Sequence, residues 1–160
     1  MKKYFDGLAV LVASAWVGGM WTAGYVAAPV LFQALPDKTM AGMVAGKLFT
    51  VAAYVGLFCA VYLLSYLYLS RGIQVLRQSV FWIVVAMLFF TLSGQYGLQP
   101  LLADLKAQAF PQYVMESAFA GQFRFWHGVS SIIFLVQSLL GGVLLLKVYG
   151  QKFGKFQNQI

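Results

Sequence analysis

Charged side chains are scarce in this chain: 11 Lys and Arg and four Asp and Glu make up 9% of its 160 residues, whereas 61% are hydrophobic. Globular proteins in water carry about a quarter charged residues. A soluble fold is therefore excluded, because it would leave too much apolar surface in water. The basic residues are scattered singly, without the clustered patch that a phosphate backbone requires. Nucleic acid is thus excluded as a partner, and membrane lipid is expected.

Residues that usually carry chemistry are nearly absent as well. A single cysteine, Cys59, excludes an intramolecular disulfide, and a single histidine, His127, excludes a conventional zinc site within one chain. The long apolar runs contain no Asp or Glu, which leaves no carboxylate for an intramembrane proton relay. Motifs such as GxSxG or a phosphate-binding glycine loop are missing. We therefore do not expect an enzyme.

What the sequence does contain is four long runs without charge, at residues 8–32, 48–70, 78–103 and 128–146. Each run is long enough to cross a hydrocarbon core of about 30 Å as an α-helix. The charges lie outside these runs, since one charge at the bilayer centre costs at least about 2.5 kcal/mol. We predict an all-α integral membrane four-helix bundle, one domain over residues 1–160, with spans at about 8–34, 46–70, 78–100 and 125–148.

The distribution of Lys and Arg predicts the orientation of these spans. Seven lie at the N-terminus, between spans two and three, or in the C-terminal tail, whereas four lie on the opposite side: Lys38, Lys47, Lys106 and Arg124. Basic residues favour the cytoplasmic side, so both termini are expected in the cytoplasm, in a bacterial inner membrane. The beginning resembles a secretory signal, but its apolar run is too long for one, and an uncleaved first helix is expected.

Small residues recur at a spacing of four along spans one and four. Such small-xxx-small faces allow helices to approach closely in lipid, where van der Waals packing drives association. They predict contact either between spans one and four or between chains of a homo-oligomer. The predicted packing positions are Ala15, Gly19, Ala23, Ala27, Ser138 and Gly142.

Three features are expected on the outer side. Pro29 lacks a backbone N–H and should kink the first span. Asp37 is placed to cap a helix that runs into span two. Between spans three and four, residues 100–123 interleave apolar and polar positions. This pattern predicts two short amphipathic helices on the outer surface, interrupted at Pro111.

The densest polar cluster beside the membrane lies at the outer start of span four, around His127. Gln95, in span three, is expected at the same depth. The imidazole either binds a metal, haem or another ligand, or donates a hydrogen bond that fixes the helix end. The candidate functional cluster comprises His127, Arg124, Ser131, Gln95, Trp21 and Tyr25.

Several motifs resemble a known family: WVGGMW at residues 16–21, APVLF at 28–32, KLF at 47–49 and FWHGVSS at 125–131. Over nearly the whole chain, the sequence resembles the bacterial domain-of-unknown-function membrane family related to eukaryotic transmembrane protein 205. The resemblance implies a four-helix membrane fold without an established biochemical activity; the eukaryotic relatives are associated with platinum-drug resistance and vesicle trafficking. There is also a remote likeness, in span number and histidine use, to copper-resistance inner-membrane proteins.

Three functions remain open from the sequence. The first is a non-enzymatic role, without cofactor, in binding a partner or shaping a membrane complex. The second is metal or haem handling by His127, with Met20 or Met115 as a soft ligand suited to copper or haem. The third is a small exporter or channel, which would need an oligomer because four helices leave little room for a pore.

The orientation generates the first testable prediction. A membrane-impermeant thiol reagent applied to intact cells should label Gln108→Cys, on the outer side, and should not label Gln157→Cys, in the tail. Labelling of Gln157→Cys alone would reverse the orientation.

Overall fold

A computed structural model describes residues 2–157 of the chain and the side chains of residues 7–150. Within this part every regular element is helical, which confirms the predicted all-α fold. The α-helices are α1 (Lys2–Trp21), α2 (Ala28–Ala34), α3 (Lys38–Arg71), α4 (Ser79–Leu92), α5 (Gln99–Ala109) and α6 (Ala120–Gln157).

The described part contains four segments that are long and apolar enough to cross a membrane: Gly7–Ala34, Lys38–Arg77, Ser79–Ala109 and Ala120–Gly150. The first consists of α1, a π-helical segment and α2, and the third of α4, a π-helical segment and α5. These segments confirm the four predicted spans. The chain is a multi-pass membrane protein.

The ends of the second span follow local sequence signals. The carboxylate of Asp37 accepts hydrogen bonds from the backbone N–H groups of Thr39 (2.8 Å) and Met40 (3.2 Å), as its predicted capping role requires. At the other end, Gly72 adopts a positive φ of 57°, which a glycine reaches without steric cost. A short 3-10 helix, Gly72–Arg77, then leads into α4.

The outer connection between spans three and four differs from the prediction. Its first helix, α5, is not a separate surface helix but continues span three to Ala109. The second predicted helix is wrong, because only a 3-10 turn, Val114–Glu116, forms there. Leu102, Leu105 and Val114 are buried in a small outer cluster with Phe123 of α6. The apolar positions of this connection therefore pack against the protein.

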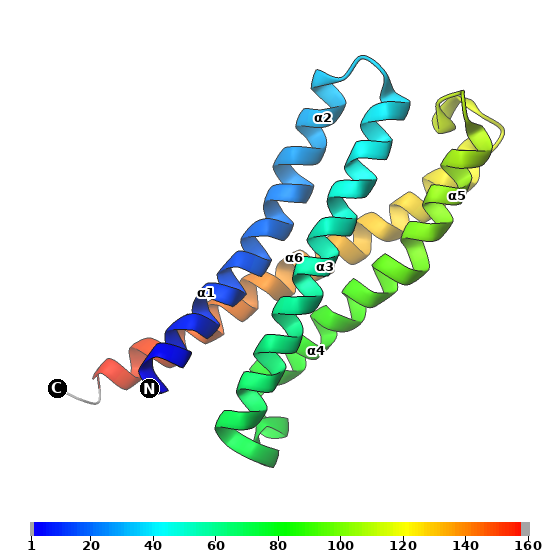
Figure 1. The fold of residues 1–160 in the computed structure, drawn as a ribbon. Coiled ribbons are helices and arrows are strands. Elements are labelled where there is room, and N and C mark those ends of the chain that lie inside the picture. Colours follow the sequence, from blue (N-terminus) through cyan, green and yellow to red (C-terminus); the bar gives the residue numbers. More distant parts are fainter. Residues whose placement is uncertain (1, 158–160) are drawn as a thin grey trace.

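The four spans form a closed ring in which α1 and α4 each pack against both α3 and α6. Figure 1 shows the start of α1 at the same end of the bundle as the turn from α3 to α4, and we call this the inner end. The α2–α3 turn and the connection from α5 to α6 lie at the other, outer end. Toward the outer end, α2 and α3 diverge from α5 and α6 in this view.

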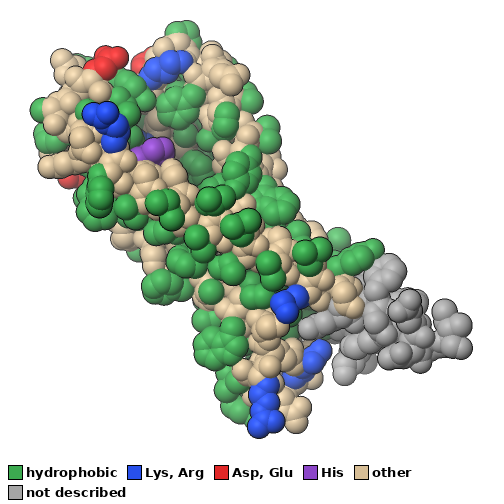
Figure 2. Space-filling model, turned by 180° about the vertical axis from the view of Figure 1, so that it is seen from behind, with side chains coloured by type: hydrophobic (Ala, Val, Ile, Leu, Met, Phe, Trp, Pro, Cys, Tyr) green, Lys and Arg blue, Asp and Glu red, His purple; other side chains and the backbone are tan. Residues whose placement is uncertain are grey.

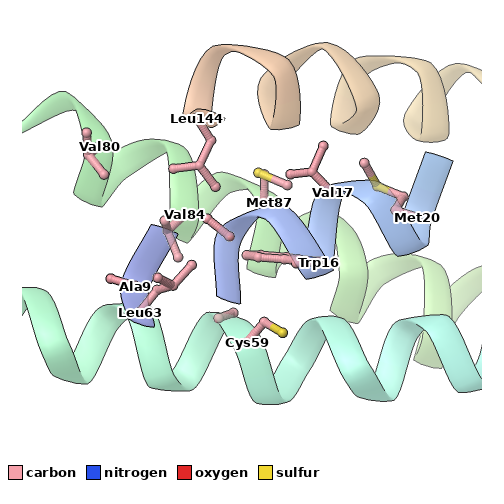
Figure 3. Packing of buried hydrophobic residues seen from close by; sticks show 12 residues of the cluster. Ala9, Trp16, Val17, Met20, Cys59, Leu63, Val80, Val84, Met87 and Leu144 are labelled. Carbon is pink, nitrogen blue, oxygen red and sulfur yellow. The ribbon is translucent and has the colours of Figure 1, made fainter. Parts of the chain in front are cut away.

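The main core lies in the half of the bundle nearer the inner end. Val17 and Met20 point from α1 toward α6, whereas Trp16 lies between α1 and α3 (Figure 3). Glycines on the neighbouring helices make room for these side chains. A Cβ on Gly141 would lie 3.1 Å from both Val17 methyl groups, and a Cβ on Gly56 would lie 2.5 Å from the Trp16 indole nitrogen.

Two of the predicted packing positions, Ala15 and Gly19 in the second half of α1, therefore take no part in helix contacts within the chain, and a role for them between chains stays a prediction. Ala15 and Gly19 are exposed, and nothing lies within 4 Å of a Cβ built on Gly19. The inward face instead carries the bulky Trp16 and Val17, which give more dispersion contact in a dry interface than small residues can. The small residues that allow close approach stand on the partner helices.

The remaining predicted packing positions lie nearer the helix contacts. Ala23 and Ser138 are buried and Ala27 is half-buried. A Cβ on Gly142 would lie 3.7 Å from the Trp21 ring, an ordinary contact distance.

The surface matches a membrane setting. Figure 2 shows one face whose middle is covered by hydrophobic side chains, with Lys and Arg toward both ends and Asp and Glu at only one. Many large apolar side chains are exposed, including Phe58 (74%) and Leu146 (74%). Such side chains favour lipid over water.

The packing of α1 generates the second prediction. Gly141→Leu should destabilise the bundle by about 1–3 kcal/mol, because the new side chain meets Val17 and Met20. Gly19→Leu, which makes the same change in open space, should have little effect. Thermal unfolding of both variants in detergent measures the difference, and equal effects would contradict this packing.

Candidate functional site

A large open cavity occupies the half of the bundle nearer the outer end and has a volume of about 1690 Å³. Residues from all four spans line it. Its walls are mostly apolar and include Trp16, Met20, Phe32, Phe49, Phe90, Leu98, Phe123 and Phe134. Ligand pockets in proteins usually measure about 300–1,000 Å³. The cavity is thus large enough for a ligand longer than a typical metabolite.

Two proline-associated π-helical segments border this cavity. The segment Thr22–Ala27 ends two residues before Pro29, and the segment Ser93–Leu98 ends two residues before Pro100. Proline has no N–H to donate, and its ring clashes with the carbonyl four residues earlier. In both places the residue before the proline donates instead to the carbonyl five residues back, Ala28 to Ala23 and Gln99 to Gly94.

The two segments occupy corresponding positions in spans one and three, and each has a tyrosine four residues before its proline, Tyr25 and Tyr96. The predicted kink at Pro29 therefore takes the form of a π-helical segment that is repeated in span three. π-Helical segments occur frequently at functional sites. Helix interruptions at matching positions in two halves of a membrane protein also point to a binding site. Both segments contribute residues to the cavity.

His127 lines the cavity near the outer end. Its ring stacks on Phe123, with centroids 5.6 Å apart and planes 7° apart. Ser131 donates its hydroxyl to the backbone carbonyl of His127 at 2.8 Å, so this serine is used within its own helix. The hydrogen bonds found among the described residues include none from the imidazole ring. Figure 2 shows the histidine in view toward the end that bears Asp and Glu.

Three amide side chains line deeper parts of the cavity. The Gln137 amide donates to the Thr91 hydroxyl at 2.8 Å, which connects α6 to α4. The Gln99 amide donates to the Gly46 carbonyl at 3.1 Å, which connects α5 to α3. The buried oxygen of Gln95 has no hydrogen-bond partner among the described residues. A buried acceptor without a donor is costly, so a ligand hydroxyl or N–H would be stabilised there.

Lysines supply all the formal charge among the lining residues. Lys106, on α5, reaches across to α3 and donates to the Gly42 carbonyl at 3.0 Å. Lys38 donates to the carbonyls of Phe32 (2.6 Å) and Leu35 at the end of α2. Lys47 lines the same cavity, whereas no acidic residue of the described part does. The cavity is therefore positively charged near the outer end.

The sequence of this chain matches one known protein family. A family model described as a domain of unknown function, DUF4149, matches residues 11–111, more than half of the chain. The chain belongs to the DUF4149 family. No curated protein and no solved structure gives a significant match. The DUF4149 match includes both π-helical segments and the three cavity lysines, and it ends before α6.

The structure brings together four of the six residues predicted for the functional cluster of this DUF4149 protein. His127, Ser131, Gln95 and Tyr25 all line the cavity. Arg124 and Trp21 are not among the residues that line it. On α6, Arg124 precedes His127 by three residues, and the inward direction at that turn is taken by the buried Phe123.

Sequence reasoning missed the lysines as site residues. Lys38, Lys47 and Lys106 entered only the count of charges on the outer side, because they are far apart in sequence. Two signals were available. Proline follows a tyrosine by four residues in both span one and span three. Of the four outer basic residues, Lys106 follows Pro100 on α5, whereas Lys38 and Lys47 stand on α3, the helix that comes directly after α2.

A metal centre finds few ligands in the described residues. No three His, Cys, Asp or Glu side chains gather there in a group that could hold an ion. His127, Met20 and Met115 all line the cavity, so a site made of imidazole and thioether would have to draw on these residues.

The hydrogen bond between Tyr25 and Ser138 generates the third prediction. The Tyr25 hydroxyl donates to the Ser138 hydroxyl at 3.0 Å and ties the first π-helical segment to α6. Tyr25→Phe should lower the free energy of unfolding by about 0.6 kcal/mol, a typical value for such bonds in membrane proteins. Tyr54→Phe, at a similarly exposed tyrosine on α3, is the control. Equal unfolding energies for the two variants in detergent would show that the bond contributes nothing.

Proposed function

We propose that this membrane protein is a non-enzymatic binding protein that takes up a long apolar molecule within the half of the bilayer nearer the outer end. The observation that carries the proposal is the open cavity of about 1690 Å³ between the four spans. The other half of the bundle is close-packed around Trp16, Val17 and Met87. The cavity is therefore a local feature of one half of the molecule.

The chemistry of the lining favours binding over catalysis. Its surface is dominated by aromatic and aliphatic side chains, with a few separated polar groups such as Gln95, Gln137 and His127. Pockets that recognise a ligand have this composition, in which apolar walls provide affinity and a few polar groups fix the orientation. A carboxylate that could orient His127 or share its proton is missing, because the described lining contains no Asp or Glu and its other titratable groups are lysines and tyrosines.

The orientation belongs to the same proposal. Both termini lie on the cytoplasmic side of a bacterial inner membrane, and the cavity lies toward the opposite side. The count of seven basic residues against four supports this arrangement. Three of the four outer basic residues line the cavity, so a ligand-binding role accounts for most of the positive charge on that side. The motifs at residues 16–21, 28–32, 47–49 and 125–131 support a relation between this chain and eukaryotic transmembrane protein 205.

Filling the cavity generates the fourth prediction. Gly94 lines the cavity and Gly97 does not, although both lie in the same π-helical segment and a Cβ added to either would have nothing within 4 Å. Gly94→Leu should occupy cavity space and reduce the amount of lipid that co-purifies with the protein, measured by mass spectrometry after gentle solubilisation. Gly97→Leu, with the same change of residue, should leave this amount unchanged.

Thermal unfolding of both variants controls for damage to the fold. Retention of the same lipids at the same stoichiometry by wild type and Gly94→Leu would overturn the proposed binding role of the cavity.

A further inference from the structure

We propose that the ligand of this cavity is an anionic amphiphile, with one carboxylate or phosphate monoester head on a long apolar chain. The head is bound by Lys106 and His127 near the outer end, and the chain extends toward Trp16 and Phe90. The inference rests on the proposed binding function and names the class of molecule bound.

The first argument is the uncompensated charge of the lining. Lys38, Lys47 and Lys106 line the cavity, and no Asp or Glu among the described residues lines it with them. The described acids stand elsewhere; Asp104, for example, is exposed and accepts from Gln108. Positive charge near an apolar phase is costly unless it is paired. An anionic head is the partner that this cavity lacks.

The second argument is the geometry of Lys106. The residue is half-buried, and its ammonium lies 5.7 Å from the centroid of the Phe123 ring and donates to the Gly42 carbonyl at 3.0 Å. An ammonium group has three N–H donors. One is used by this carbonyl, and the described hydrogen bonds of Lys106 include no other. Two donors therefore remain for the oxygens of a carboxylate or phosphate.

The third argument is the position of His127 against the same aromatic ring. The imidazole stacks on Phe123, which also contacts the Lys106 ammonium. A neutral imidazole still carries one N–H donor. Among the described residues this donor has no hydrogen-bond partner. Lys106 from α5 and His127 from α6 thus present two kinds of donor beside one aromatic ring.

The fourth argument is the composition of the cavity beyond these donors. Toward the core the lining includes Trp16, Met20 and Phe90, which have no charge to offer a polar ligand. Trp16 and Met20 belong to the main core. A small hydrophilic anion would leave this apolar surface without a partner, whereas an alkyl or acyl chain would cover it. The lining therefore fits a molecule with one charged end.

The test compares ligands that share a chain and differ in the head. Binding of hexadecyl phosphate, hexadecanol and inorganic phosphate to the full-length protein in phosphatidylcholine nanodiscs is measured by isothermal titration calorimetry. Hexadecyl phosphate should bind at least about tenfold more tightly than hexadecanol, given the strength of hydrogen bonds to charged groups. Millimolar inorganic phosphate should not displace it.

Variants then assign the head to Lys106. Lys106→Met should remove the preference for hexadecyl phosphate and leave the affinity for hexadecanol unchanged. Lys147→Met, which makes the same change near the inner end and outside the cavity, should keep the preference. His127→Gln, which retains an amide donor, should lower the preference less than Lys106→Met does.

The outcomes separate this inference from the binding function. Equal wild-type affinities for hexadecanol and hexadecyl phosphate would overturn the anionic head but keep the apolar cavity, whereas no binding of either would overturn both. Displacement by inorganic phosphate alone would overturn the need for a chain. Phosphatidic acid included in the nanodiscs distinguishes the source: competition with hexadecyl phosphate indicates a bilayer lipid, and its absence indicates a single-chain anion.

Discussion

The structure depends on one constraint, the need to satisfy every backbone hydrogen bond inside a bilayer where no water can do so. Pro29 and Pro100 each remove a donor from a spanning helix, and in both cases the chain responds with a π-helical segment just before the proline. The extra residue in each widened turn lets the helix continue. Both interruptions border the same cavity. The π-helical segments that accommodate the two prolines therefore lie at the same depth as the cavity.

Packing explains why the cavity is confined to one half. Near the inner end, Gly56 and Gly141 let Trp16 and Val17 come into close contact with α3 and α6, which closes the core. Toward the outer end, the contact between α3 and α5 includes the hydrogen bonds of Gln99 and Lys106 to glycine carbonyls. Bonds of this kind hold helices together while leaving space between them. One half of the bundle is therefore close-packed and the other is open.

Basic residues have different roles at the two ends of the bundle. Basic residues near the inner end match the bias that orients membrane proteins. On the other side, Lys38 and Lys106 donate to carbonyls at the edge of the cavity, where their remaining donors are available to a ligand. These outer lysines reduce the difference in basic residues between the two sides of the membrane, but they lie where the proposed function needs positive charge.

The sequence by itself determined the four spans, because charge is excluded from hydrocarbon wherever a helix crosses it, and it determined the cap at Asp37, because capping is local. It also predicted that His127, Gln95 and Tyr25 lie toward the outer end, since depth along a span follows from position in the sequence, and all three line the cavity there. Tertiary structure alone decided that Trp16 and Val17, rather than Gly19, face the neighbouring helices, and that Lys106 crosses to Gly42. Those outcomes depend on the rotation of each helix about its axis, which is set by contacts between residues far apart in the chain.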